Sequence, residues 1–330
     1  MTNVAAQARN STAPGRVLAL SGGVGGAKLA LGLASRLQPE QLAIVANTGD
    51  DFEHYGLRIC PDLDTVMYTL ARRNNQAQGW GLADESWRVM NALAELDGEV
   101  WFRLGDLDLA THLQRSEMLR RGRSLTQVTQ QLCDRLGVRH RLLPMTDDSV
   151  ATIVHTDGGA LNFQHYFVRE QCRPAVLGFE FSGIETARPQ HEFVEWLSGD
   201  TLDAVIICPS NPFVSVDPIL QLPGVRALLL ACTAPVIAVS PIVAGAAIKG
   251  PTAKMLRELD MPCSALAVAQ HYGDILDGFI IDSADAAQAD AIAELDIAVH
   301  VAPTIMHSLE DRVELARETL EFAARLRGDA

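Results

Sequence analysis

The sequence has few aromatic and few basic residues. Phe, Trp and Tyr make up 5% of its 330 residues, and 27 Lys plus Arg stand against 41 Asp plus Glu, for a formal net charge of −14. A nucleic-acid backbone is bound by clustered Lys and Arg, which this composition does not favour. The chain also has no basic amphipathic stretch and no apolar run near the ~20 residues of a membrane span. We therefore expect neither a nucleic-acid partner nor a membrane partner.

Two further absences concern the cellular compartment. None of the six cysteines is spaced as in a zinc site or a redox motif. The N-terminal residues MTNVAAQARNSTAPG lack the apolar segment of a secretory signal. Small polar residues of this kind predict a disordered lead over residues 1–15. Reduced thiols and no signal peptide together predict a cytoplasmic protein.

Apolar runs of strand length are frequent, and helical patterns separate them. A helical pattern runs from Asp64 to about Arg73, and another from Leu309 to Leu326 closes the chain. Val/Ile/Leu runs alternating with helices are typical of a parallel sheet covered on both faces, so the predicted class is doubly wound α/β. The predicted strands are RVLAL from Arg16, QLAIVAN from Gln41, DAVIICP from Asp203, APVIAVSP from Ala234 and GFIIDS from Gly278.

The middle of the chain has a different pattern. Residues 80–137 are mainly helical and polar, and the segment from Val150 alternates about Asp157-Gly158-Gly159, which predicts a β-hairpin. We interpret residues 16–330 as one α/β domain with a helical and hairpin elaboration over about residues 80–170.

A glycine-rich loop follows the first predicted strand and opens the first helix. Glycines let backbone N–H groups approach an anion, and the helix N-terminus favours negative charge, so the loop predicts a phosphate site. A Walker A loop is excluded, since Ala27 precedes the lysine and Leu29 follows it. The dinucleotide fingerprint fails too, because a lysine replaces its third glycine and Ala46-Asn47 replaces the acid after the second strand. The candidate residues are Ser21, Gly22, Gly23, Gly25, Gly26 and Lys28.

Acidic residues follow the second predicted strand. Asp50 lies in NTGDD, and Asp62 and Asp64 lie in PDLDT. Carboxylates beside a phosphate loop require a cation between them, and Mg²⁺ is the hard cation suited to carboxylate and phosphate oxygens. We therefore assign Asp50, Asp62 and Asp64 as candidate metal ligands, with Asp62 and Asp64 as catalytic. The structural alternative is that one of the PDLDT aspartates caps the following helix.

Two further segments are candidates for the edge of the site. Arg103 follows the apolar residues Val100-Trp101-Phe102, taken as a short strand, and a guanidinium there could neutralise phosphate or carboxylate. Its alternative role is that of a surface arginine. Ser210 and Asn211 lie in PSNP after the strand from Asp203, where they offer neutral hydrogen bonds to a base or a sugar. The histidines, His112 among them, show no metal-ligand spacing.

Taken in order, these motifs resemble the 2-phospho-L-lactate transferases of coenzyme F-420 biosynthesis. The resemblance runs from about Arg16 to the last helix. No single motif is decisive, but their joint order is highly specific. The motifs are SGGVGGAKL, NTGDD, PDLDT, RLGDLDLATH, LPMTDD, PSNPFVS, VAVSPI and IKGPTAK.

The resemblance implies a Rossmann-like core with a helical insertion, a homodimer and a requirement for Mg²⁺. It implies transfer of a phosphorylated three-carbon acid from its guanosine diphosphate diester to a hydroxyl of the deazaflavin Fo (7,8-didemethyl-8-hydroxy-5-deazariboflavin), with release of GMP. By motif, Asp64 and Arg103 would contact Fo, while the glycine-rich loop, Ser210 and Asn211 would hold the nucleotide or GDP. Gly26-Ala27 stands where archaeal members have Thr-Pro, so donor preference can differ.

Several alternatives stay open at this stage. The acid is 2-phospholactate, phosphoenolpyruvate or 3-phosphoglycerate. A non-enzymatic nucleotide-sugar-binding regulator shares the core and a glycine-rich loop, but the paired acids of PDLDT and the PSNP turn favour the enzyme. An NAD oxidoreductase is disfavoured by the missing fingerprint.

Overall fold

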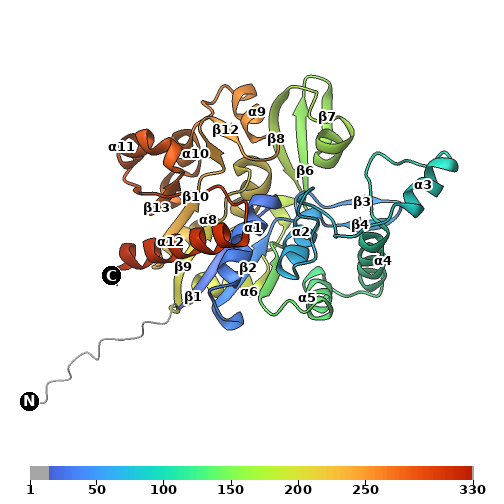
Figure 1. The fold of residues 1–330 in the computed structure, drawn as a ribbon, viewed down its shortest axis with the longest axis horizontal. Helices are drawn as coiled ribbons and strands as arrows, with labels where there is room; N and C mark the ends of the chain where they lie inside the picture. Colours follow the sequence, from blue (N-terminus) through green and yellow to red (C-terminus); the bar gives the residue numbers. More distant parts are fainter. Residues whose placement is uncertain (1–14, 329–330) are drawn as a thin grey trace, which may run out of the picture.

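The computed structural model describes residues 15–328, and a seven-stranded sheet lies at its centre (Figure 1). All neighbouring strands of this sheet pair in parallel. From edge to edge the strands are β14 (Ala298–Val301), β13 (Gly278–Ile281), β10 (Val236–Val239), β9 (Leu202–Ile207), β1 (Arg16–Ser21), β2 (Leu42–Ala46) and β5 (Arg141–Pro144). The prediction of a Rossmann-like, doubly wound α/β fold is confirmed.

Both faces of the sheet are covered. On β1, Leu18 and Leu20 belong to one hydrophobic core, whereas Val17 and Ala19 belong to the other. Successive side chains of a strand point to opposite faces, so a strand buried on both sides must be apolar throughout. This explains why RVLAL and LAIVA read as continuous apolar runs rather than alternating ones.

Helices form the two outer layers, with α1 and α12 together on one face (Figure 1). Short single-turn elements lie between them at Pro39–Gln41, His165–Arg169, Ile184–Thr186, Pro212–Val216, Gly273–Ile275 and Ser283–Gln288. The helices are α1 (Gly23–Ala34), α2 (Pro61–Leu70), α3 (Arg88–Glu95), α4 (Asp106–Arg120), α5 (Leu125–Leu136), α6 (His191–Ser198), α7 (Asp217–Leu220), α8 (Val225–Ala231), α9 (Thr252–Glu258), α10 (Ala265–Tyr272), α11 (Ala289–Ala293) and α12 (Leu309–Arg327).

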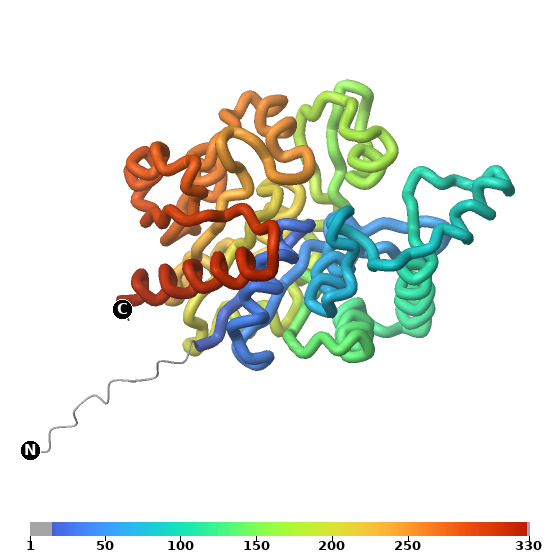
Figure 2. Tube along the Cα trace, in the orientation of Figure 1, coloured from blue at the N-terminus to red at the C-terminus, as the bar shows by residue number. Residues whose placement is uncertain are grey.

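The predicted helical insertion and hairpin are both present. Figure 2 shows that the insertion with α3 and α4 extends away from the sheet. The hairpin is part of a three-stranded sheet in the order β7 (Gly159–Asn162), β6 (Ala151–Thr156), β8 (Val176–Ser182). Two smaller antiparallel pairs are β3 (Phe52–His54) with β4 (Leu57–Ile59) and β11 (Ile242–Val243) with β12 (Ala246–Ala247).

Two local predictions were wrong. Val100–Phe102 is not a strand but a bent loop before α4, where its aromatic side chains pack on one another instead of pairing with a sheet edge. Helix α2 begins at Pro61, three residues before the predicted start at Asp64, because proline at the first helical position has a suitable φ and needs no hydrogen-bond donor. The acids of PDLDT therefore lie inside the first turn of the helix.

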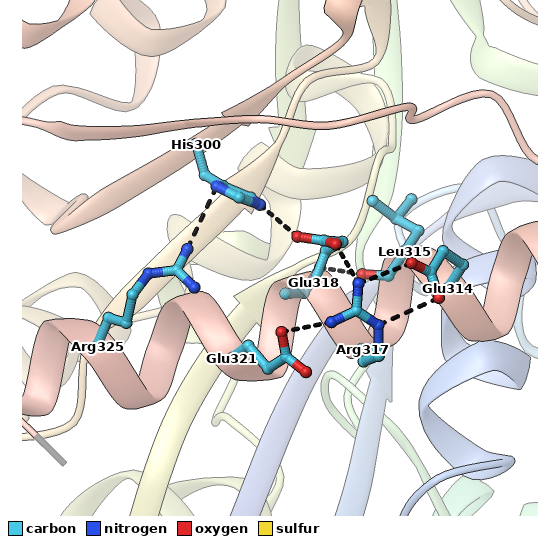
Figure 3. A network of polar contacts seen from close by, with 8 residues as sticks. His300, Glu314, Leu315, Arg317, Glu318, Glu321 and Arg325 are labelled. Carbon is cyan, nitrogen blue, oxygen red and sulfur yellow. Dashed lines mark hydrogen bonds and ion pairs between the residues drawn. The ribbon is translucent and has the colours of Figure 1, made fainter. Parts of the chain in front are cut away.

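The closing helix α12 carries an ion-pair network on its outer face (Figure 3). Arg317 pairs with Glu314, Glu318 and Glu321, and His300 on β14 contacts Glu318 at 2.7 Å. The Ser308 side chain caps the helix N-terminus by accepting a hydrogen bond from the Asp311 N–H. These contacts fix α12 against the strand at the sheet edge.

Some predictions concern parts or properties that the fold does not decide. The predicted disordered lead, apart from Gly15, lies outside the described residues. Within residues 15–328, no one helix has the length and apolar character to cross a membrane. One bent pair, Pro212–Leu220 with Val225–Ala231 at 81°, meets those two criteria only when its helices are taken together.

The order of the strands locates the functional edge. From β1 the chain winds outward to β2 and β5, then returns beside β1 as β9 and winds the other way. The point between β1 and β9, at the carboxyl ends of the strands, is where open α/β sheets bind ligands.

Candidate active site

A cavity of about 730 Å³ lies at this switch point. Its walls come from distant parts of the chain: the glycine-rich loop after β1, the first turn of α2, the loop after β9, the insertion, and segments 248–252 and 304–306. All the sequence-predicted site residues except Ser21 and Gly26 line it, and Gly26 packs closely on Ser21. The structure thus brings the predicted motifs into one site.

The glycines of the loop have two separate roles. Gly23 has φ +62°, a left-handed conformation that favours glycine. Gly25 and Gly26 are needed for close packing instead: a Cβ would lie 2.3 Å from the Pro209 carbonyl oxygen at Gly25 and 2.5 Å from the Ser21 Oγ at Gly26. The N-cap of α1 is Gly22, which has no side chain, and the first-turn N–H groups of Val24 and Gly25, beside the cavity, are left for a ligand.

The PSNP loop is fastened to the glycine-rich loop. Ser210 Oγ accepts a hydrogen bond from the Gly22 N–H at 3.2 Å and donates one to the Gly22 carbonyl at 2.9 Å. The side-chain oxygen of Asn211 accepts from the N–H groups of Phe213 and Val214 and so caps the following turn. Both side chains therefore shape the cavity wall as well as lining it.

Lys28 does not reach back over its own loop. Its Nζ donates to the carbonyl oxygen of Met306 at 2.6 Å, and Met306 also lines the cavity. Burial lowers the pKa of Lys28, and the positive charges of Arg312 and Lys249 lower it further. These three cations give one end of the cavity a positive potential suited to an anionic ligand.

Asp50 and Asp62 form a buried acidic pair. The Gly23 N–H donates to Asp62 Oδ1 at 2.8 Å, and the Asn47 amide donates to Asp62 Oδ2 at 3.0 Å. Burial raises the pKa of Asp62 to about 6. Burial and the charge of Asp62 raise the pKa of Asp50 well above its usual value, and Asp50 Oδ1 is buried without a hydrogen-bond partner in the described chain. Two such carboxylates are stable as anions only with a counter-charge between them.

Asp64 is held differently from Asp50 and Asp62. Its two oxygens accept hydrogen bonds from the guanidinium of Arg115 on α4, one of them at 3.0 Å. The alternative role of an N-cap is wrong for both Asp62 and Asp64, because the N-cap of α2 is Cys60 and the two acids lie in its first turn. The three predicted metal ligands are thus a pair facing the loop and a third acid paired with arginine.

A second group of titratable side chains adjoins Asp64, and its members Asp108 and His112 also line the cavity. Asp64, Asp108 and His112 each place one ligand atom within 4.8 Å of the others, which is compatible with a metal ion. The spacing analysis missed His112 because its partners come from two helices. However, Arg115 already neutralises Asp64, so Asp50 and Asp62 are the more suitable carboxylates for Mg²⁺.

The other end of the cavity is aromatic. Phe163 and Phe167 stack at 5.4 Å with an interplanar angle of 7°, and Trp101 and Phe102 also line the cavity. Such a surface can cover a planar ring system. Arg103 is exposed at the rim, with its guanidinium 4.4 Å above the Trp87 ring.

Arg115 is a buried charged residue beside the site that sequence reasoning missed. Asp108, His112 and Arg115 stand at positions i, i+4 and i+7 of one helix, and all three are buried. Charged residues recurring on one helical face, within a segment interpreted as helical and polar, were the signal that could have revealed them.

The chain was compared with known proteins. The family 2-phospho-L-lactate transferase CofD matches residues 17–317. A phosphoenolpyruvate transferase of Kitasatospora aureofaciens is 42% identical, over 94% of this chain and 99% of its own length. A 2-phospho-L-lactate transferase of Methanosarcina acetivorans is 39% identical, over 91% and 96% respectively. A crystal structure of a UPF0052 family member from Bacillus halodurans has a TM-score of 0.61 at 14% identity, covering 93% and 100%, and so shares the fold.

These matches agree with the site. The glycine-rich loop, the paired acids and the PSNP turn all fall within the matched residues. The prediction of an enzyme is confirmed, and the non-enzymatic regulator is set aside. The chain belongs to the 2-phospho-L-lactate transferase family and is a transferase.

Proposed function

We propose that this transferase acts in coenzyme F-420 biosynthesis, moving a phosphorylated three-carbon acid from its guanosine diphosphate diester to the hydroxyl of Fo and releasing GMP. The acid is 2-phospholactate, phosphoenolpyruvate or 3-phosphoglycerate. The proposal extends to Mg²⁺ dependence, a homodimer and a cytoplasmic location, which follow from the sequence and the family resemblance.

The observation that carries the proposal is the polarity of the cavity. A loop with free helix N–H groups and three nearby cations lies toward one end, and an aromatic wall lies at the other. Asp50, Asp62 and Asp64 lie between them on the cavity lining. A diphosphate fits the first end and a deazaflavin ring fits the second, so the reacting phosphorus and hydroxyl would meet near the acids.

The residues present fit Mg²⁺. Asp50 has a buried oxygen without a hydrogen-bond partner in the described chain. The carboxylates of Asp50 and Asp62 repel one another when both are ionised, and a bound cation would offset this repulsion. We assign Asp50 and Asp62 to hold the ion, while Asp64 retains its arginine partner. When bound, Mg²⁺ would neutralise charge on the diphosphate oxygens.

The chain's own residues supply the remaining contacts. The N–H groups of Val24 and Gly25 would bind the phosphates of the donor, and Lys28 would contribute positive charge beside them. Asp64 would accept the hydrogen bond of the Fo hydroxyl and orient it toward the phosphorus. Because phosphoryl-type transfer depends mainly on positioning and charge neutralisation, no covalent nucleophile is required.

The proposal is tested with purified protein, Fo, Mg²⁺ and each of the three guanosine diphosphate diesters. We expect GMP release that depends on Fo, together with a phosphodiester product of Fo detected by mass spectrometry. The Asp50→Asn/Asp62→Asn variant is the negative control. GMP release at the same rate without Fo would show hydrolysis instead, and no release with any donor would refute the proposed function.

A further inference from the structure

The polar network around Asp64 includes Tyr68, Asp108 and His112, which line the cavity, and Arg115, which does not. It links Tyr68 on α2 to Asp108 and His112 on α4, and then to Arg115 and back to Asp64 on α2. Arg115 is 1% exposed and Asp64 is 5% exposed. Burying a charged pair is expensive unless its hydrogen bonds are well made, so such a network needs a reason beyond stability.

The hydrogen bonds assign the tautomer of His112. Arg115 carries only donors, so its Nη1, 3.2 Å from His112 Nδ1, must donate to that nitrogen. A neutral His112 then carries its proton on Nε2, which lies 3.3 Å from Asp108 Oδ1. Tyr68 donates to the same Asp108 oxygen at 2.7 Å. The guanidinium of Arg115 is thus held by His112 on one side and by Asp64 on the other.

The network joins the two parts of the site that must be aligned. Helix α2 carries Asp62, which contacts the glycine-rich loop, and Asp64 two residues later. Helix α4 follows Trp101, Phe102 and Arg103 directly, and these form part of the cavity's aromatic end. The pairing of Asp64 with Arg115 therefore fixes the aromatic end relative to the phosphate loop.

We propose that Arg115 is a positioning residue for the transfer: it fixes the Asp64 carboxylate toward the acceptor hydroxyl, and His112, whose Nδ1 accepts a hydrogen bond from Arg115, fixes Arg115 in turn. This rests on the proposed function. Arg115 does not line the cavity, so it acts through Asp64 rather than on the substrate. Lysine in its place would keep the charge but lose the two-pronged contact, leaving the carboxylate free to rotate.

The test is a double-mutant cycle between Arg115→Lys and Asp64→Asn. In the wild-type background, Arg115→Lys should lower kcat about 10- to 100-fold, with the KM of the donor unchanged. In the Asp64→Asn background the same substitution should change kcat less than about twofold, because the group through which it acts is gone. Arg120→Lys, the same substitution at an exposed ion pair of the same helix, is the matched control and should have no effect.

The outcomes separate the two proposals. Losses that multiply in the double variant would overturn the positioning role, since they would show that Arg115 acts independently of Asp64. No GMP release by the wild type would instead refute the proposed function.

If Arg115→Lys fails to fold, as judged by circular dichroism, the cycle is run with His112→Asn. The decrease in kcat that this variant causes should likewise vanish in the Asp64→Asn background. If Asp64→Asn turns over too slowly, the same cycle is read from Fo affinity by fluorescence.

Discussion

The N–H of Gly23 donates a 2.8 Å hydrogen bond to Asp62 Oδ1, 39 residues further along the chain. The helix end that would ordinarily attract a phosphate is thereby partly occupied by a carboxylate of the protein itself. An anionic donor meets this carboxylate on entering the site. The arrangement becomes favourable when a cation binds beside Asp62 and reverses the sign of the local charge.

We predict that Mg²⁺ stabilises the protein and is required for turnover. At a concentration 100 times the Kd, a ligand that binds the folded state alone adds about 2.7 kcal/mol. Differential scanning fluorimetry should show a higher Tm with Mg²⁺, and EDTA should abolish activity. The Tm shift should disappear in Asp50→Asn/Asp62→Asn. Full turnover in metal-free buffer would contradict the metal assignment.

Without metal, stability should fall as pH rises through the acidic range. Burial raises the pKa of Asp62 from 3.8 to about 6, so the folded state holds this proton more tightly than the unfolded state. The contribution of protonated Asp62 to the free energy of unfolding is fully present below pH 3.8. It is lost between pH 3.8 and about 6 and is absent above that. A shift of about two units corresponds to about 3 kcal/mol.

The measurement compares urea unfolding of wild type and Asp62→Asn in EDTA from pH 4 to pH 7. Asparagine cannot ionise. Between pH 4 and pH 7 the free energy of unfolding of the variant should therefore fall by about 3 kcal/mol less than that of the wild type. Parallel pH profiles for the two proteins would show that Asp62 ionises without penalty in the fold.

Asp64→Asn should lower kcat strongly, by about 10²- to 10⁴-fold if its carboxylate assists the hydroxyl as a base, and should also lower stability because the buried Arg115 loses its counter-charge. The amide keeps the size of the side chain but loses the charge that pairs with Arg115. Steady-state kinetics and circular dichroism measure the two effects. Asp134→Asn, on the exposed face of α5, is the control. A folded Asp64→Asn enzyme with the wild-type rate would limit Asp64 to a structural role.

Arg103→Ala should weaken Fo binding and leave GDP binding unchanged. The guanidinium lies at the aromatic end, away from the phosphate loop. Loss of one charged hydrogen-bonding contact costs about 1.5–3 kcal/mol, or roughly ten- to a hundredfold in affinity. Isothermal titration calorimetry with each ligand tests this, with Arg135→Ala as the control. Weaker GDP binding with unchanged Fo binding would reverse our placement of the two ends.

Gly25→Ala should destabilise the protein by about 1–3 kcal/mol, the usual cost of inserting a methyl group into a packed contact. The obstacle is backbone, the Pro209 carbonyl oxygen, which cannot swing aside as a side chain can. Gly178→Ala, where a Cβ meets nothing within 4 Å, should be tolerated. Equal stability of the two variants would mean that the loops have room to separate.

The sequence predicted the fold well because the central strands bury both faces. Runs such as LAIVA can hardly be exposed, and their alternation with helices leaves a parallel sheet as the simple solution. Val100–Phe102 misled the same reasoning, because three apolar residues that pack as an aromatic cluster read like a short strand.

The site was predictable only where its residues are adjacent in sequence. PDLDT and the glycine-rich loop are recognisable as motifs. Arg115 joins the site only through its hydrogen bonds to Asp64, which is 51 residues away on another helix. Lys28 shows the same limit: its position in the loop suggested contact with phosphate, but its ammonium donates to the Met306 carbonyl, 278 residues away in sequence. Such pairings depend on how helices pack, which local patterns do not encode.

The placement of β1 between β2 and β9 also determines the order in which parts of the protein can fold during synthesis. β1 and β2 can pair early, but residues 202–207 must leave the ribosome before the first strand gains its second neighbour. The Ser210 hydroxyl that fastens the glycine-rich loop reaches it across 188 residues. Contacts this distant in sequence are slow to form, because a long loop must close first. Until then the acidic residues of the site are exposed in the nascent chain, because the later segments that enclose them have not been made. The catalytic cavity is therefore one of the last parts of the protein to form.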